Sequence, residues 1–326
     1  MNFMNTLIRN QIVFFLFVHT TLATNAQITD VNSTVGRSFQ GVKVIRINTT
    51  GGTIELDRNN SKVVHVAVTF NLDKKEYKPI FEQTDSILFL KEEFVFKPSP
   101  STESIWRVNV PDGLEVQYSA QAGDLNVTNL KIAISANSIS GNYNWKNVSG
   151  NSTITSPAGD IKIENYQGTL GIKGRKGNVI ISKYGGKLDI DTGPGDVKLT
   201  EVTGSMAVTT SSGAIQAQKV TIAEKSFFSS KSGAAELWLA APVEKYLEIS
   251  TTSGPAILHC KGMKLEGLLI LIASRRSEIK SPYPIDRSED IKDSNGASRV
   301  RNKSQLGSST NVIKLSTESG VVVVKK

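Results

Sequence analysis

Glycine recurs at every ninth position through the middle of the chain, and the residues between successive glycines alternate between apolar and polar. Apolar residues stand two and four places after each glycine, as Ile161 and Ile163 do after Gly159. A period of two over a short stretch is typical of a strand with one buried face. Each nonapeptide is therefore predicted to be one short strand. The glycines of the series are Gly141, Gly150, Gly159, Gly168, Gly177, Gly186, Gly195, Gly204 and Gly213.

The same alternation predicts which face of the sheet each residue occupies. A slip of one residue would exchange the two faces, so the assignment is sharp. The residues expected in the core are Ile161, Ile163, Leu170, Ile172, Val179, Ile181, Leu188, Ile190, Val197, Leu199, Met206 and Val208. The residues expected in water are Lys162, Glu164, Lys173, Asp189, Asp191, Lys198 and Thr200.

Two kinds of turn alternate along the series, which doubles the repeat to eighteen residues. The first is a Ser/Thr-x-x-Gly turn, as in residues 192–195 and 210–213. Its hydroxyl is expected to bond a backbone amide two or three residues on, and its glycine is expected to take a positive φ. The second turn has an apolar residue two places before glycine, which is expected to fill a corner of the core. These residues are Val148, Tyr166, Tyr184 and Val202.

A single strand-turn-strand-turn unit cannot bury its apolar face alone, so the units must stack. The predicted fold class is all-β: a parallel β-helix, or β-solenoid, with about 18 residues and two main strands per coil. Residues 136–278 form the regular solenoid in this prediction, and residues 27–135 form less regular N-terminal β-coils continuous with it. Residues 279–311 are expected to be a charged excursion or loop that helps cap the open end. Residues 312–326 are expected to be terminal strands.

The N-terminal coils show alternating or continuous apolar stretches between turn residues, which predict strands. A loop is expected at 97–103, and the Pro-Asp-Gly turn at 111–113 leads into a strand at 114–118. The other strands are expected at residues 42–47, 53–56, 63–70, 87–90 and 106–110.

The first residues predict export. Arg9 precedes an apolar run at 12–18 and small residues at 21–26, the layout of a secretory signal peptide. The apolar run is shorter than the roughly 20 residues that a membrane-spanning helix needs, so cleavage after Ala26 is expected, with a retained signal anchor as the alternative. Residues 1–26 are thus the predicted signal peptide, and the protein is expected in the periplasm or at the cell surface, without a transmembrane anchor after cleavage.

Charge and cysteine content narrow the chemistry. The formal net charge is +8, but acids and bases are interspersed, and the basic cluster at 299–303 lacks the interleaved aromatics of a nucleic-acid surface. Cys260 is the only cysteine, so no intramolecular disulfide forms, and its apolar strand predicts a buried, reduced thiol. His65 and His259 stand alone in the sequence. We therefore expect no metal site, no cofactor and no catalytic residue.

Four aromatic residues surround the point where the repeat lengthens from eighteen to about twenty residues: Phe227, Phe228, Trp238 and Tyr246. We expect them to fill the core of a widened coil. The alternative is an aromatic binding platform.

Several stretches carry a family resemblance. They are Trp106-Arg-Val-Asn-Val-Pro-Asp-Gly113, Ala122-Gly-Asp-Leu-Asn-Val127, the serial Ser-Gly turns, and Leu315-Ser-Thr-Glu-Ser-Gly320 followed by three valines. This pattern resembles the bacterial putative-adhesin family of β-strand-repeat envelope proteins, a domain of unknown function. The resemblance covers nearly all of residues 36–326. It implies an envelope protein and carries no catalytic residues to transfer.

The predicted function is that of an exported cell-envelope structural or binding protein, adhesin-like and without catalytic activity, whose partner is an envelope glycan or protein. One alternative is a polysaccharide-acting β-helix enzyme, which needs paired carboxylates. Asp189 and Asp191 share a strand, while Asp160 and Asp196 occupy equivalent sites two coils apart, about 10 Å from each other. The other alternative is a periplasmic partner of an envelope signalling system.

Overall fold

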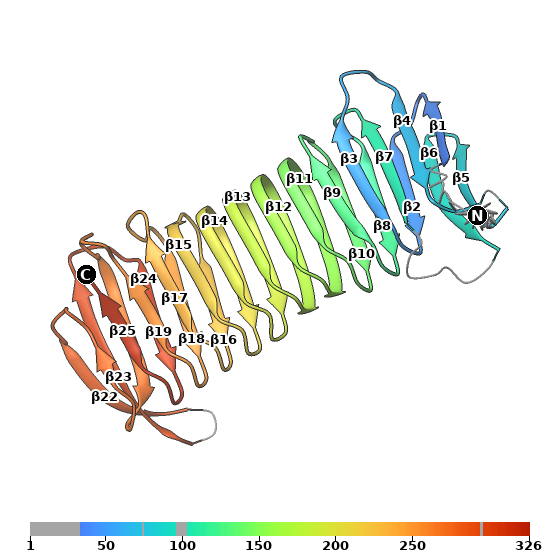
Figure 1. Ribbon diagram of the computed structural model, residues 1–326. Helices are drawn as coiled ribbons and strands as arrows, with labels where there is room; N and C mark the ends of the chain where they lie inside the picture. Colours follow the sequence, from blue (N-terminus) through green and yellow to red (C-terminus); the bar gives the residue numbers. More distant parts are fainter. Residues whose placement is uncertain (1–32, 74, 96–102, 294–295) are drawn as a thin grey trace, which may run out of the picture. The chain divides into compact units, whose positions relative to one another are not determined.

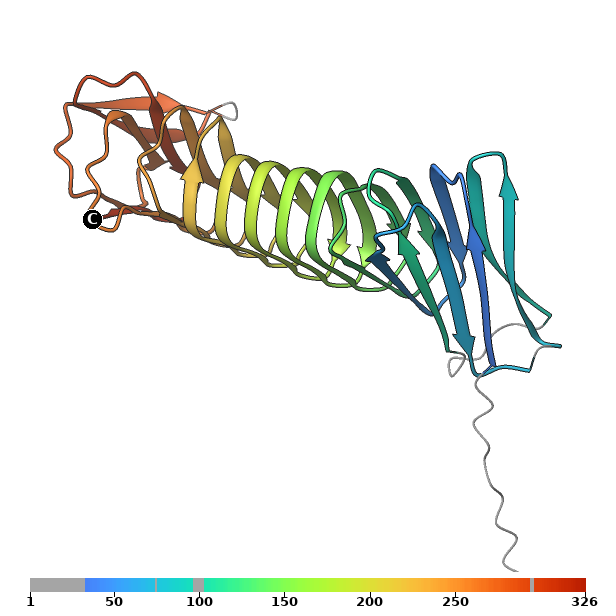
Figure 2. The same cartoon turned by 90° about the horizontal axis from the view of Figure 1, so that it is seen from above.

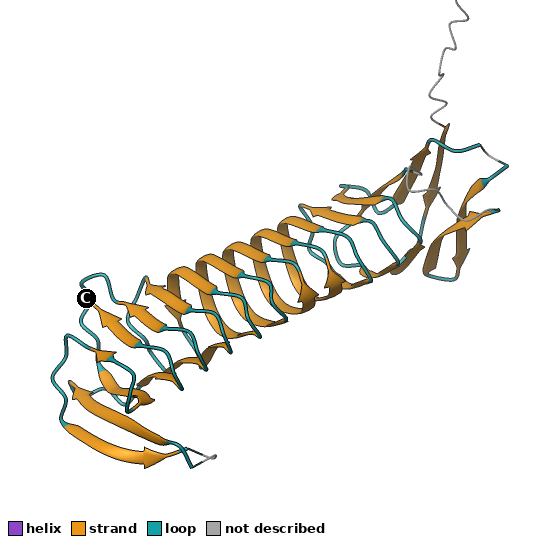
Figure 3. Ribbon diagram, turned by 60° about the horizontal axis from the view of Figure 1, so that its bottom comes forward, coloured by secondary structure: helices purple, strands orange, loops and turns teal. Residues whose placement is uncertain are grey.

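The computed structural model describes residues 33–73, 75–95, 103–293 and 296–326. The predicted signal peptide and residues 97–102 of the predicted loop lie outside these residues. The described residues contain strands and no helix, and all their strands belong to one hydrogen-bonded sheet (Figure 3). The all-β prediction is therefore confirmed. Within the same described ranges no helix is long and apolar enough to cross a membrane.

The strands fall into three groups along the chain. The first group comprises β1 (Ser33–Phe39), β2 (Val44–Thr49), β3 (Thr53–Arg58), β4 (Val64–Phe70), β5 (Tyr77–Thr84), β6 (Ile87–Phe94) and β7 (Ser104–Val110). The second comprises β8 (Glu115–Ala120), β9 (Asp124–Thr128), β10 (Ala133–Ser138), β11 (Tyr143–Ala158), β12 (Ile161–Lys176), β13 (Val179–Thr192), β14 (Val197–Thr210), β15 (Ile215–Ile222), β16 (Ser226–Ser230), β17 (Ala235–Leu239), β18 (Tyr246–Thr251) and β19 (Ala256–His259). The third comprises β20 (Gly267–Ser274), β21 (Ile279–Lys280), β22 (Arg287–Lys292), β23 (Ser298–Leu306), β24 (Val312–Thr317) and β25 (Val322–Lys325).

The second group forms a solenoid-like parallel stack (Figure 1). Ile161 pairs with Val179 and Val179 with Val197, and each step equals the doubled glycine repeat. Every apolar residue predicted to face the core of this stack is at most 2 % exposed, while Lys162, Lys173 and Lys198 are exposed. The predicted register is therefore confirmed.

The regular step extends beyond the boundary expected at residue 136. Glu115 already pairs with Ala133, again one full repeat further along the chain, so the regular stack begins at β8. Towards the other end the step grows, because Ala207 pairs with Phe227 and Phe227 pairs with Glu248, both further along the chain than one repeat. This lengthening agrees with the repeat of about twenty residues predicted here.

At every turn the repeat glycine leaves no room for a Cβ atom. Only some of these glycines also have a positive φ. Gly159 has φ of 127°, as predicted, but Gly195 and Gly213 do not have a positive φ, so the prediction is wrong there. A Cβ on Gly213 would lie 2.0 Å from the carbonyl oxygen of Gly195. The glycines of successive coils thus lie directly against one another, and any side chain would push the coils apart.

The hydroxyls of the first turn behave as predicted at Thr210 and Ser230, but not at Thr192, whose buried Oγ1 has no hydrogen-bond partner. The amide of Gly213 donates to Oγ1 of Thr210 at 3.1 Å, and the amide of Gly233 donates to Oγ of Ser230 at 2.9 Å. Both hydroxyl groups are buried, with at most 1 % of each residue exposed. The turn therefore satisfies backbone donors that the strands leave without a partner.

The second turn is a corner that holds a buried side chain, also as predicted. Tyr166 and Tyr184 are at most 2 % exposed, and their rings stack with centroids 5.8 Å apart. Their hydroxyls donate to the carbonyl oxygens of Gly150 and Gly168, at 3.0 and 2.8 Å. Each ring therefore fills the core and bonds the backbone of the preceding coil.

Sequence reasoning missed the residue just before this buried side chain. It has a positive φ of 55–58° in six successive coils, which turns the chain at the corner while the strand pairing continues on both sides. In the first of these coils the amide side chains bond one another: Nδ2 of Asn147 donates to Asn129 and Nδ2 of Asn165 donates to Asn147, both at 2.9 Å. The six residues are Asn129, Asn147, Asn165, Lys183, Glu201 and Lys219.

At both ends of the stack, coils pair out of sequence order (Figures 1 and 2). Strand β2 lies between β6 and β8, and β3 lies between β7 and β9. At the other end, β24 lies between β18 and β20, and β25 lies between β19 and β21. The first and last coils of the chain are therefore each inserted between coils formed by other segments.

Antiparallel strands extend the sheet beyond these inserted coils. Strands β5 and β6 pair antiparallel at the N-terminal end, and β20, β23 and β22 do so at the C-terminal end. Residues 279–311, expected to be an excursion or loop, thus contain β21, β22 and β23. In β23 the charged Arg299, Arg301 and Lys303 alternate with the buried Asn302 and Ser304, so a strand with little apolar content still packs one face. Pro79 in β5 and the charges of β22 blunt edges that would otherwise recruit further strands.

Cys260 is buried, as predicted, with 0 % of its surface exposed. Burial raises the pKa of its thiol to about 11. At pH 8 this lowers the reactive thiolate fraction on the order of a hundredfold relative to a free cysteine. We expect thiol reagents to label the native protein slowly and the urea-unfolded protein at the rate of a free thiol. Rapid labelling without denaturant would contradict the burial.

Candidate functional site

The candidate site is a groove on the outer face of four adjacent strands, β6, β2, β8 and β10. Two adjoining depressions of about 390 and 380 Å³ share Asn48, Lys91 and Ser119. The pairing register aligns the outward residues of the four strands in two rows. The polar groove is defined by these rows: Phe89, Arg46, Gln117 and Ser135 in one, and Lys91, Asn48, Ser119 and Asn137 in the other.

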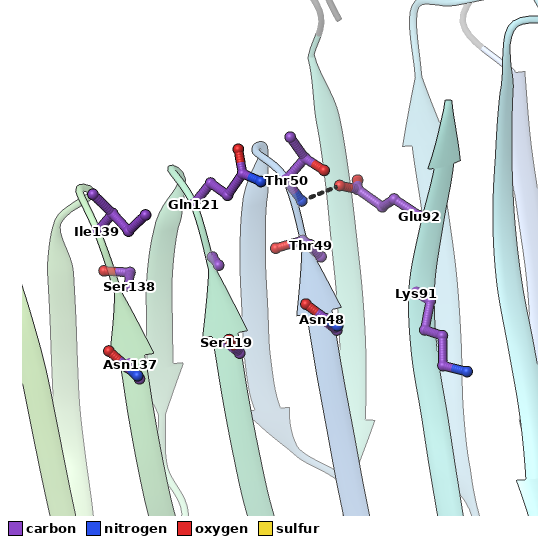
Figure 4. Close-up of a pocket in the computed structure, with 11 residues that line it drawn as sticks. Asn48, Thr49, Thr50, Lys91, Glu92, Ser119, Gln121, Asn137, Ser138 and Ile139 are labelled. Carbon is purple, nitrogen blue, oxygen red and sulfur yellow. Dashed lines mark hydrogen bonds between the residues drawn. The ribbon is translucent and has the colours of Figure 1, made fainter. Parts of the chain in front are cut away.

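Asn48, Ser119 and Asn137 lie side by side on three strands and point out of the sheet (Figure 4). In the part of the chain that the structure describes, no hydrogen bond engages these three side chains. Asparagines stacked on adjacent coils elsewhere bond each other, but here a serine separates the two amides. The groove therefore presents free amide and hydroxyl groups to solvent.

One wall of the groove is fixed by Glu92, which sequence reasoning missed. Its carboxylate accepts four hydrogen bonds: from the Thr50 amide at 2.9 Å, the Tyr77 hydroxyl at 2.9 Å, Oγ of Ser104 at 2.7 Å and Nε1 of Trp106 at 3.1 Å. These donors come from the turn after β2 and from β5 and β7. Glu92 therefore ties the inserted coil to the strands outside it, and its acceptor sites are largely taken.

The other row of the groove is held by an aromatic ring. Arg46 and Lys91 lie over Phe89, with the guanidinium carbon 5.6 Å and the ammonium nitrogen 5.2 Å from the ring centroid. Nε of Arg46 also donates to Gln117 at 3.0 Å. These contacts, with the ion pair of Lys91 and Glu82 at 3.2 Å, fix the positions of the two cationic groups beside the ring.

Asp160 and Asp196, the carboxylates expected in the alternative of a polysaccharide-acting enzyme, bond backbone amides of the next coil. Oδ1 of Asp160 accepts from the Asn178 amide at 2.7 Å, and Oδ1 of Asp196 accepts from the Ala214 amide at 2.8 Å. Asn178 lies between the two aspartates and accepts from the Asp196 amide at 3.1 Å. A ladder of alternating Asp and Asn thus bonds each coil to the next without placing like charges on adjacent strands.

Asp189 and Asp191 are exposed, as predicted, and line a separate depression of about 260 Å³. Lys173, one coil earlier, lies beside Asp191 in the pairing register. The carboxylates therefore face water next to an ammonium group, as surface charges commonly do.

The prediction that the four aromatic residues of the widened coils fill the core is wrong for three of them. Phe228 is buried, but Phe227 is 43 % exposed and Trp238 and Tyr246 are half-buried on the outer faces. The reason is the strand period of two: Phe227 must point opposite to Phe228, and Trp238 opposite to the buried Leu237. The outward rings pair with neighbours, Phe227 with Tyr246 at 5.5 Å and Trp238 with His259 at 4.4 Å between centroids.

His65 and His259, which stand alone in the sequence, each have a hydrogen-bond partner in the structure. Nε2 of His259 lies 2.6 Å from Oε1 of Glu236, and Nδ1 of His65 lies 2.8 Å from Oγ of Ser38. Within the described ranges, no group of three or more histidine, cysteine or acidic residues is placed to hold a metal ion.

Comparison with known proteins matches the middle of the stack to a family. Residues 108–266 match the family model described as Toastrack DUF4097. The chain carries a Toastrack DUF4097 domain. The matched residues include most of the stretches at 106–113 and 122–127 that carried the resemblance, whereas those at 315–323 lie outside the match.

Solved structures that match the chain are described as putative adhesins. One from Bacteroides fragilis is 15 % identical with a TM-score of 0.35, and the match covers 90 % of this chain and 96 % of that one. One from Parabacteroides merdae is 14 % identical with a TM-score of 0.32, covering 68 % of this chain and 89 % of that one. Comparison with curated proteins finds no match.

The polar groove straddles one border of the Toastrack domain. Ser119 and Asn137 belong to the domain, while Asn48 and Lys91 come from coils that precede it in sequence. The ladder of Asp160 and Asp196 lies inside the domain, and the antiparallel strands β22 and β23 lie outside it. The groove is therefore formed jointly by the repeat and by the coil inserted at its end.

Proposed function

We propose that this protein is an exported, non-catalytic binding protein of the cell envelope, in which a β-solenoid of two-stranded coils holds a glycan in the polar groove. The observation that carries the proposal is the alignment of Asn48, Ser119 and Asn137 on three strands, all exposed and without internal hydrogen bonds. Glycans present many hydroxyl groups, and convergent amides and hydroxyls are suited to bond them.

The shape and fixation of the groove support binding rather than chemistry. It is shallow and open, so it does not enclose a reacting bond away from water. The carboxylate that lines it, Glu92, already accepts four hydrogen bonds. Strands hold the polar groups at fixed spacing, which limits the entropy lost when a ligand orders them.

The test is binding of the purified protein to neutral oligosaccharides and to glycans released from envelopes, measured by glycan array and calorimetry. Replacing Asn48 or Asn137 by alanine should each weaken the affinity about fivefold or more, since a lost ligand hydrogen bond is typically worth on the order of 1 kcal/mol. The control is Asn144→Ala, an exposed asparagine on β11, in the column of strands on the other side of the stack, where its Nδ2 donates to Oδ1 of Asn126 at 3.1 Å.

Two outcomes would overturn the proposal. Equal loss of binding in Asn144→Ala, or none in the groove variants, would remove the groove as the site. If the protein shortens the oligosaccharides, and the Asp160→Asn or Asp196→Asn variant does not, then the protein is a hydrolase and the proposal is wrong.

A further inference from the structure

We infer that the C-terminal strands carry a second binding surface, which takes a polysaccharide whose sugars bear carboxylate groups. The surface lies on the outward side of β22, β23, β20 and β24, far along the stack from the polar groove (Figure 1). This cationic face is defined by Arg287, Arg299, Arg301, Lys303 and Lys314.

The strand register brings these cations together. Arg299, Arg301 and Lys303 alternate along β23, so all three point to one side. Lys303 pairs with Ile270 of β20, and Ile270 pairs with Lys314 of β24, which places Lys314 in the same row. Arg287 of β22 pairs with Lys303 from the other side. Cations from β22, β23 and β24 thus form one positively charged surface.

Two carboxylates on this face leave a clear excess of positive charge. Glu289 lies 2.6 Å from Arg301, 3.0 Å from Lys303 and 3.2 Å from Arg287, and these cations lower the pKa of its carboxyl group to about 2. Glu248 lies 2.7 Å from Lys314. Five cations against two anions give a net charge of +3, and Glu289 holds three of the cations in position.

The chemistry of the face favours a carboxylated glycan. Three of its five cations are arginines, whose planar guanidinium groups bond carboxylates in pairs. The apolar residues between them are largely covered, since Ile272 is 8 % exposed and Ile270 is half-buried, so there is little to insert into a lipid bilayer. A flat sheet face with fixed cations suits an extended chain with repeated negative charges.

The experiment compares binding of oligogalacturonate and of its methyl ester, which has the same backbone without the charges. The protein should bind the acid form and not the ester, and the affinity should fall steeply with added salt. Arg301→Gln and Lys303→Gln should each lower the affinity about tenfold, the usual loss for one charge-assisted contact. Lys162→Gln and Lys198→Gln, exposed lysines of the opposite face of the stack, should leave it unchanged.

Each alternative result has a definite meaning. Equal binding of ester and acid, or equal loss in the Lys162 and Lys198 variants, would overturn the assignment. Binding to vesicles of anionic lipid but not to oligogalacturonate would mean that the cationic face binds a membrane and not a polysaccharide. Because the Asn48 and Asn137 variants leave this face intact, failure here leaves the polar groove untouched, and failure of the groove leaves this face untouched.

Discussion

Replacing Gly186 by alanine should destabilise the folded protein by about 4 kcal/mol or more. Gly186 has φ of 129°, a region that residues with a Cβ rarely adopt, and an added Cβ would lie 2.1 Å from the carbonyl oxygen of Gly168. The obstacle is backbone on the neighbouring coil, which cannot move without breaking the pairing of β12 and β13. Relief would therefore require two coils to separate.

Gly171→Ala is the matched control for this substitution. Gly171 lies in the same strand pair, but a Cβ there would meet only Cγ2 of Thr153 at 3.6 Å, an ordinary contact, and its φ is not positive. Alanine should be neutral there or stabilise the fold by up to about 1 kcal/mol, because it restricts the unfolded chain. Denaturant unfolding followed by circular dichroism measures both variants. Similar midpoints for the two would show that the glycine contacts do not limit the spacing of the coils.

The central stack could be predicted from sequence because its determinants are local. A glycine at fixed spacing and a period of two place Ile181 and Ile190 inside without any knowledge of distant partners. The equal length of the coils then makes each residue pair with its equivalent in the next coil, as Ile163 does with Ile181. In a repeat, the local sequence pattern therefore also predicts which residues pair between coils.

At the ends the strands themselves could be predicted, as β3 and β6 show, but their neighbours could not, because the pairing joins segments far apart in sequence. Val44 pairs with Glu115 on one side and with Ile87 on the other, and the alternation in β2 fits any parallel neighbour. The same holds for β24, which is inserted between β18 and β20. The choice of neighbours depends on how much apolar surface all the strands of that end bury together.

The polar groove was missed for a related reason. Ser119 and Asn137 are one repeat apart and pair as the repeat requires, so half of the groove was accessible to sequence reasoning. Asn48 joins them only through the inserted coil, and Glu92 through a strand outside it. The left-handed corner residues show a further limit: Asn147 tolerates a positive φ readily, but Lys183 and Glu201 give no sign of it.

Replacing Ile190 by alanine should cost about 2–5 kcal/mol of unfolding free energy, the usual loss for a large aliphatic core residue with its cavity. Ile190 is 1 % exposed and pairs with Ile172 on one side and Val208 on the other. Strands on both sides hold the backbone at a fixed spacing, so the core has little freedom to collapse into the cavity. The cost should therefore fall in the upper half of the range.

Lys198→Ala provides the contrast from the outer face. Lys198 is exposed and has no special contact, so its loss should cost less than about 0.5 kcal/mol. A large effect at Lys198 with a small one at Ile190 would mean that the two faces are exchanged and the register is wrong.

Coupling between coils gives this prediction a second, independent measurement. Ile172 and Ile190 are neighbours in adjacent coils, so the double substitution to alanine leaves one joined cavity, and its cost should differ from the sum of the single costs by about 0.5 kcal/mol or more. Ile190 and Leu56 lie in coils far apart in the stack, and their effects should add within about 0.5 kcal/mol. Because each coil contacts only its neighbours, coupling that fades with distance along the stack follows directly from the pairing. Equal coupling for both pairs would require the core to respond as one body rather than coil by coil.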